Sequence, residues 1–198
     1  IKEICNMDIK NIIEKNFDEH YSTLELVNDK LDELIELVGK QLAVSLSNGG
    51  TLFWCGNGGS AADSQHLAAE LVGRFKKNRR ALRSVALTTD TSVLTCVAND
   101  YSYNDIFSRQ IEALGRSGDV LVGISTSGNS HNVIQALKTA KEMGLVTIAM
   151  LGKDGGMTKK LVDHSLIIPS NSTARIQEMH ILIGHILCEI IEKELQLD

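Results

Sequence analysis

The chain has 198 residues, of which 43% are hydrophobic, so it can bury one good core and is expected to form a single domain. Twenty basic and 25 acidic side chains give a formal net charge of −5, which argues against a nucleic-acid-binding surface. The same balance means that any site for a phosphorylated ligand must be built locally. No signal peptide and no apolar run long enough to cross a bilayer is evident, so we expect no membrane partner and a cytoplasmic location.

The four cysteines, Cys5, Cys55, Cys96 and Cys188, are widely spaced and form no CxxC pair. Cys55, Cys96 and Cys188 lie in apolar runs, which is typical of free thiols in a core. They predict a protein of a reducing compartment.

The N-terminal segment, residues 1–47, is predicted to be helical. We expect one helix from Met7 to about Tyr21 and a second from Ser22 to Ser47, ended by Asn48-Gly49-Gly50. In the second helix apolar residues recur at helical spacing: Leu24, Val27, Leu31, Leu34, Leu37, Val38, Leu42, Val44 and Leu46. Such a stripe packs either against the same chain or against another subunit, and the sequence leaves both open.

A strand, a glycine turn and a helix are predicted over residues 51–74. Thr51–Cys55 has the pattern of a buried strand, Gly56-Asn57-Gly58-Gly59-Ser60 is the turn, and Ala61–Arg74 carries strong helix formers. Such a unit presents free backbone N–H groups and the positive end of the helix dipole at one point, which attracts phosphate. Ser60 is a candidate N-cap, with its hydroxyl free to face an anion. The alternative is an ordinary tight turn.

The helix over Ala61–Arg74 has a polar pair opposite an apolar face. We expect the apolar face to consist of Leu67, Leu71 and Val72. His66 and Glu70 are four residues apart, so they project from one face and can bind one metal or act on one substrate. The alternative is a solvated pair.

The rest of the chain alternates strands with helices. The expected strands are Ser84–Leu87, Asp119–Ile124, Leu145–Met150 and His164–Ile168. The expected helices are Thr91–Ala98, Asn104–Leu114, Val133–Met143 and Ala174–Leu195, with a polar turn at Asn99–Tyr101 and a short helix after Gly156. This alternation predicts an α/β fold with a doubly wound parallel sheet flanked by helices. The basic stretch Lys76–Arg80 is expected to be a solvated loop.

A second polar loop, Ser125–Ser130, follows a predicted strand and precedes a helix. Ligands of such sheets bind outside the carboxyl ends of the strands. Hydroxyl and N–H groups on a small loop form an uncharged cradle for phosphate. The hydroxyls are those of Ser125, Thr126, Ser127 and Ser130. An ordinary Ser/Gly turn is the alternative.

These motifs carry a resemblance. CGNGGS at 55–60, His66 with Glu70, ISTSGNS at 124–130 and RIQEMH at 175–180 together resemble the phosphoheptose isomerases of the SIS (sugar isomerase) domain family. The resemblance runs from about Leu24 to the C-terminus. It implies one SIS domain over residues 1–198. The implied reaction is aldose–ketose isomerisation, which converts sedoheptulose 7-phosphate to D-glycero-D-manno-heptose 7-phosphate for lipopolysaccharide, capsule or another glycoconjugate.

The resemblance also implies one zinc ion per subunit, held by His66, Glu70, Gln177 and His185. On spacing alone, Gln177 and His185 differ by about 80° around a helix and about 12 Å along it, so His180 is a rival ligand. We follow the resemblance and expect His180 either to support the ligands without binding the metal or to be structural. For the remaining histidines we expect surface or turn positions: His20, His131 and His164.

The chemistry implied by the resemblance needs an acid–base pair. Glu70 is expected to take the C–H proton and His185 to make the second transfer, while zinc polarises the oxygens of the enediolate. The implied substrate contacts are Asn57, Gly58, Gly59, Ser60, Glu70, Asn99, Asp100, Ser125, Thr126, Ser127, Ser130 and Gln177. Arg74 is expected either to support the site or to be a surface arginine. Ala174 stands where some members have Asp, which leaves the sugar preference open.

Two other functions compete. Some similar SIS proteins are not enzymes and bind the bacterial replication initiator, but they lack the glutamate and the late histidine that this chain has at Glu70 and His185. An isomerase of another sugar phosphate is the third possibility. The resemblance further implies a homotetramer with its sites at subunit junctions, where Gln177 or His185 would meet His66 across an interface.

Overall fold

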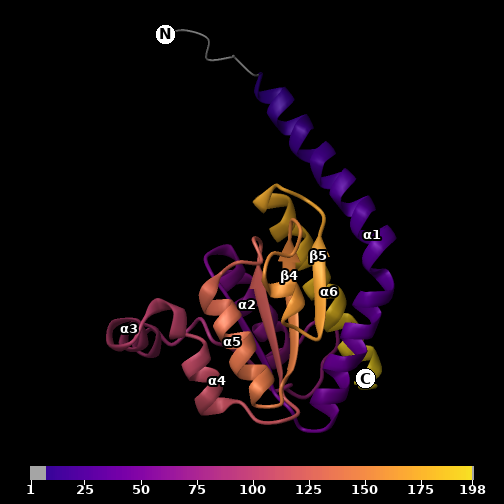
Figure 1. Ribbon diagram of the computed structural model, residues 1–198. Helices are drawn as coiled ribbons and strands as arrows, with labels where there is room; N and C mark the ends of the chain where they lie inside the picture. Colours follow the sequence, from indigo (N-terminus) through magenta and orange to yellow (C-terminus); the bar gives the residue numbers. More distant parts are fainter. Residues whose placement is uncertain (1–7, 198) are drawn as a thin grey trace.

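The computed structural model describes residues 8–197, which fold around a five-stranded parallel sheet (Figure 1). The strand order is β2-β1-β3-β4-β5, and every neighbouring pair is parallel. The strands are β1 (Leu52–Gly56), β2 (Ser84–Ala86), β3 (Val120–Ser125), β4 (Val146–Gly152) and β5 (His164–Ile168). The predicted α/β fold and its five strands are confirmed. The central strands β1 and β3 are buried throughout, as their unbroken apolar runs require.

Helices cover both faces of the sheet. The α-helices are α1 (Ile9–Ser47), α2 (Gly59–Val72), α3 (Thr91–Asp100), α4 (Ser108–Leu114), α5 (His131–Glu142) and α6 (Thr173–Glu194). Two short 3₁₀ turns, η1 (Tyr103–Asp105) and η2 (Thr158–Lys160), lie between them. Side chains of α1, α2 and α6 share one core cluster on one face, and those of α3, α4 and α5 share the cluster on the other.

The predicted division of the N-terminal segment into two helices is wrong. The break between Tyr21 and Ser22 does not exist, and α1 is continuous. Neither Gly nor Pro stands near that point, and the hydroxyls of Ser22 and Thr23 donate back to the carbonyls of Asp18 and Glu19 inside the helix. The predicted start at Met7 lies outside the described residues.

The polar turn expected at Asn99–Tyr101 begins later than predicted. Asn99 and Asp100 form the end of α3, and the chain turns after them through Tyr101 and η1 before α4 starts at Ser108. The hydroxyl of Ser102 caps η1 by accepting the N–H of Asn104, which explains where the turn falls.

The apolar stripe of α1 packs partly within the chain. Val27, Leu31, Val38, Leu42 and Leu46 are buried in the core cluster with α6, whereas two members of the predicted stripe, Leu37 and Val44, are exposed. Towards its N-terminus α1 projects beyond the rest of the fold (Figure 1). That part carries exposed apolar side chains: Ile9, Ile12, Ile13, Phe17 and Tyr21.

The predicted core thiols are confirmed at two of three positions. Burial raises the pKa of Cys55 and of Cys188 to about 12, so both stay protonated and inert. Cys96 is exposed instead, and its Sγ lies 3.5 Å from Asp100 Oδ2. It lies on α3, where only Val97 is buried. Among residues 8–197, none of the helices combines the length and the apolar character that a bilayer crossing needs.

Candidate active site

The glycine turn after β1 is required by close packing at the start of α2. Gly58 is the N-cap residue and has a φ of +56°, which favours glycine. A Cβ on Gly59 would clash with the side-chain amide of Gln177 from α6. The expectation that Ser60 is the N-cap is wrong: the chain turns into the helix at Gly58, so Ser60 lies in the first turn and is buried.

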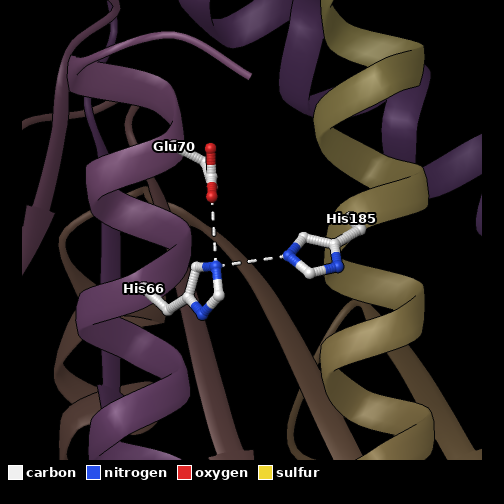
Figure 2. A group of neighbouring side chains, drawn as sticks. All are labelled: His66, Glu70 and His185. Carbon is white, nitrogen blue, oxygen red and sulfur yellow. Dashed lines mark hydrogen bonds and ion pairs between the residues drawn. The ribbon is translucent and has the colours of Figure 1, made fainter. Parts of the chain in front are cut away.

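Close packing of α2 against α6 brings three predicted site residues together. Gly184 packs so tightly that a Cβ there would lie 2.5 Å from Leu67 Cδ2. The next residue in α6 is His185, and the residue before Leu67 in α2 is His66. Figure 2 shows His66 and Glu70 on α2 facing His185 on α6. The helix contact therefore sets the separation of the two imidazoles.

The three side chains converge on His66 Nε2. It lies 3.0 Å from Glu70 Oε1 and 3.3 Å from His185 Nε2, and one ligand atom from each residue falls within 4.8 Å of the others. A single ring N–H cannot donate to both neighbours at once, so the group is suited to sharing a cation or a proton. Two imidazoles and one carboxylate form a ligand set that zinc accepts. The site is half open, with the His66 side chain 48% exposed.

Leu67 and Leu71 form the buried face of α2 as predicted, but Val72 does not. It is 48% exposed because α2 ends there and the chain departs at Gly73. His185 and His66 belong to the same chain and lie in contact, so their pairing does not require an interface between two subunits.

Gln177 lies apart from this group. It packs against Gly59, and seven helical residues put Gly59 about 10 Å along the axis of α2 from His66. His180 is also apart: it is fully buried, and its Nε2 lies 3.0 Å from the carbonyl oxygen of Leu151. Burial lowers the pKa of His180 to about 4, so it is neutral, as expected for a structural histidine.

The Ser125–Ser130 loop forms a compact hydroxyl-lined turn between β3 and α5. The Oγ atoms of Ser125 and Ser130 lie 3.1 Å apart. Ser130 is the N-cap residue of α5, yet its hydroxyl makes no capping bond, so it can serve a ligand. Gly128 has a φ of +65°, and a Cβ there would clash with the carbonyl of Gly155. Thr126 and Ser127 are half-buried in the same loop.

A pair of asparagines joins this loop to the glycine turn. Asn57 Nδ2 donates to Asn132 Oδ1 at 2.9 Å, and Asn132 Nδ2 donates back to Asn57 Oδ1 at 2.8 Å. The hydroxyl of Tyr103 donates to the same Asn57 oxygen at 3.0 Å. Sequence reasoning missed Asn132 and Tyr103, although Asn132 follows ISTSGNS by only two residues.

The other expected contacts lie at the surface of the chain. Asn99 and Asp100 are exposed at the end of α3 and bond to each other, with Asn99 Nδ2 2.9 Å from Asp100 Oδ1. Arg74 is exposed on the loop after α2, and Ala174 is exposed in the first turn of α6.

Of the remaining histidines, His131 matches the expected surface position. His131 is exposed at the start of α5, and His164 is half-buried at the start of β5. His20 lies on α1 with a half-exposed side chain, and its Nδ1 is 2.7 Å from Glu178 Oε2.

Two further residues beside the group were missed from the sequence. Asp63 lies one turn before His66, and its Oδ2 is buried with no hydrogen-bond partner among the described residues. Burial raises the pKa of Asp63, and His66 opposes that shift. The ring of Phe75 stacks on that of His185, with centroids 5.4 Å apart and planes 17° from parallel. The spacing of Asp63 from His66 could have signalled it; nothing in the sequence signals Phe75.

Comparison with known proteins identifies the family. A family model described as the SIS domain matches residues 16–152. Phosphoheptose isomerase 1 of Campylobacter jejuni is 55% identical over 183 residues, which cover 92% of this chain and 98% of that protein. This chain belongs to the phosphoheptose isomerase family.

Solved phosphoheptose isomerases share the whole fold. The enzyme from Neisseria gonorrhoeae superposes with a TM-score of 0.90 at 44% identity, and that from Francisella tularensis with 0.92 at 35%. Each comparison covers 94% of this chain and 100% of the other. The predicted family, the SIS fold and the assignment as an isomerase are therefore confirmed.

Proposed function

We propose that this member of the phosphoheptose isomerase family converts sedoheptulose 7-phosphate to D-glycero-D-manno-heptose 7-phosphate. The observation that carries the proposal is the convergence of His66, Glu70 and His185 within 4.8 Å. Relatives at 51–55% identity are named phosphoheptose isomerases, which supports a seven-carbon sugar phosphate as substrate.

The reaction moves a carbonyl from C2 to C1. A base must take a proton from C1 and return it to C2, while a second group moves a hydroxyl proton from O1 to O2. Glu70 is the proposed base, since its carboxylate is held by His66 at 3.0 Å and its side chain remains 25% exposed to a ligand. His185 is the proposed second group, because an imidazole can give and take protons near neutral pH.

The nitrogen and oxygen donors of the three residues fit a zinc ion, with Gln177 as the proposed fourth ligand. When bound, the ion would polarise the two substrate oxygens as a Lewis acid. Because Gln177 lies about two turns away along the helix in the same chain, the fourth ligand would come from a rearranged Gln177 or from that of a second copy.

The phosphate is proposed to bind in the Ser125–Ser130 loop. Its hydroxyls, its backbone N–H groups and the start of α5 supply donors without a formal charge. The sugar would then extend past Asn57, which the Asn132 pair ties to this loop, towards Glu70. Further proposed contacts to the sugar chain are Gly58, Gly59, Ser60, Asn99, Asp100 and Gln177.

We also propose a homotetramer that completes the site. His66 is half-exposed in a single chain, and the projecting part of α1 leaves five apolar side chains uncovered. A cytoplasmic location is favoured by the free thiols of Cys55 and Cys188. The product would then serve lipopolysaccharide, capsule or another glycoconjugate.

Proton NMR of sedoheptulose 7-phosphate with purified protein tests the proposal. We expect an aldose anomeric signal with the wild type, and none above background with Glu70→Gln or His185→Ala. A folded, metal-replete protein that gives no aldose would refute it and favour another sugar phosphate or a non-enzymatic SIS regulator. The presence of both Glu70 and His185 in one cluster argues against the regulator, which has no chemical use for them.

A further inference from the structure

The loop between α2 and β2 is held in place by one buried carboxylate. Glu192, near the end of α6, has a side chain that is only 4% exposed. Its Oε1 accepts from the N–H of Phe75 and from Arg79 Nε, and its Oε2 accepts from the N–H groups of Lys76 and Lys77. Burial would raise the pKa of Glu192, but the bonds from Arg79 and the three N–H groups together hold it below its usual range.

Arg79 ties the same loop back to α2. Its side chain is 1% exposed, so the expectation of a fully solvated basic loop is wrong at this position. Arg79 Nη1 donates to the carbonyl oxygen of Leu71 at 2.9 Å, and Arg79 Nη2 donates to the carbonyl oxygen of Glu70 at 3.0 Å. These carbonyls belong to the last turn of α2, where helical partners are lacking. Arg79 is buried because it satisfies this helix end and Glu192 together.

Phe75 is thereby fixed over His185. The torsion that turns an imidazole about its Cβ–Cγ bond has broad minima, so rotamer preference alone does not fix the ring plane. Histidines that bind metals usually have the second ring nitrogen hydrogen-bonded to a carboxylate or carbonyl, which fixes the ring. Among the described residues, the only hydrogen-bond partner of the His185 ring is His66 Nε2. The ring of Phe75 stacks on the His185 ring and is a further contact that can hold its plane.

We propose that Phe75 is a positioning residue, which with Glu192 orients the His185 imidazole towards His66 and Glu70. The expected effect on the rate rests on the proposed function, whereas the expected effect on the orientation of His185 does not. Loss of the Phe75 ring should free His185 to rotate, so that metal affinity and the rate of the chemical step fall while substrate binding persists.

The test compares Phe75→Leu with Phe75→Tyr, which keeps a stacking ring. Leu114→Ala, which removes an exposed apolar side chain at the end of α4, is the matched control. Zinc affinity is measured by competition with a chromophoric chelator, and the ring-proton NMR signals of His185 are followed in protein with labelled histidine. Thermal unfolding confirms that each variant is folded.

Phe75→Leu should bind zinc about tenfold more weakly, as is typical when the support of a metal-binding histidine is lost. It should also lower kcat at saturating zinc with KM within about twofold, and abolish the ring-current shift of His185 caused by the stacked ring. Phe75→Tyr and Leu114→Ala should behave as the wild type. Glu192→Gln should weaken zinc binding in the same direction and add little to Phe75→Leu in the double variant, because both act through one contact.

Wild-type zinc affinity in Phe75→Leu would overturn the inference, because removal of the stacked ring alone changes the His185 signals whatever the imidazole does. So would equal losses in Phe75→Leu and Phe75→Tyr. Zinc affinity and the NMR signals need no turnover. A wild-type protein that does not isomerise the heptose would therefore refute the proposed function alone, and the positioning role would still be decided by the zinc affinities of Phe75→Leu and Phe75→Tyr.

Discussion

Replacing Gly184 by alanine tests whether the packing of α2 on α6 sets the geometry of the site. An added Cβ would lie 2.5 and 2.6 Å from the two δ-carbons of Leu67, where ordinary contacts start near 3.4 Å. Leu67 is fully buried, and protein interiors are close-packed, so we expect the helices to separate by a large part of an ångström. Alanine favours a helix over glycine by about 1 kcal/mol, whereas overpacking costs about 1–3 kcal/mol.

We therefore expect Gly184→Ala to lose roughly 0–2 kcal/mol of unfolding free energy. Because His185 and His66 are next to the two residues in contact, the same separation should lower zinc affinity about tenfold or more, since ligand distances tolerate only about 0.2 Å. Gly39→Ala is the matched control: its Cβ would lie 2.6 Å from Ile190 Cγ2, so it crowds α1 against α6 away from the three ligands.

Denaturant unfolding of the metal-free proteins measures stability, and chelator competition measures zinc affinity. Gly39→Ala should be destabilised to a similar extent and bind zinc as the wild type does. The reasoning would be refuted if Gly184→Ala were destabilised but bound zinc as the wild type does. An equal loss of zinc affinity in Gly39→Ala would also refute it.

Three other variants test separate parts of the account. Gly128→Ala forces a side chain into a backbone of positive φ and against Gly155, so binding of inorganic phosphate measured by calorimetry should weaken while zinc affinity stays; unchanged phosphate binding would place the anion elsewhere. Asn132→Ala removes two of the three side-chain bonds that orient Asn57 and leaves the one from Tyr103, so KM in the NMR assay should rise about tenfold for the loss of about 1.4 kcal/mol, and a pure kcat effect would contradict this. Burial lowers the pKa of His180 from 6.5 to about 4, so the unfolded chain binds the extra proton between these values; stability should fall by up to about 1.4 kcal/mol per unit as the pH drops through that window. In His180→Gln this component of the pH dependence, followed by urea unfolding, should disappear; an unchanged slope would show that other groups cause it.

The sheet could be predicted because its inner strands β1, β3 and β4 are buried on both faces and therefore read as nearly unbroken apolar runs. The helix boundaries were less predictable, since they depend on single hydrogen bonds. The hydroxyls of Ser22 and Thr23 find acceptors inside α1, so the helix passes a point where its sequence suggested a break. Exposure also depends on tertiary packing, which placed Cys96 at the surface and the side chain of Arg79 in the interior.

In the candidate site, helical spacing alone paired His66 with Glu70, because residues four apart share a face. Their approach to His185 is a contact between residues 119 positions apart, and only the family resemblance indicated it. Phe75 and Asn132 were missed because their roles arise from a ring stack and an amide pair that no local pattern encodes.

Turnover of sedoheptulose 7-phosphate by metal-stripped and zinc-reconstituted protein tests the central claim most directly. We expect the stripped wild type to be inactive and to regain full activity with about one zinc per chain, while Glu70→Gln binds zinc more weakly and stays inactive even when saturated. Undiminished turnover by the metal-free wild type, or full activity of zinc-loaded Glu70→Gln, would contradict a metal-dependent isomerase centred on His66, Glu70 and His185.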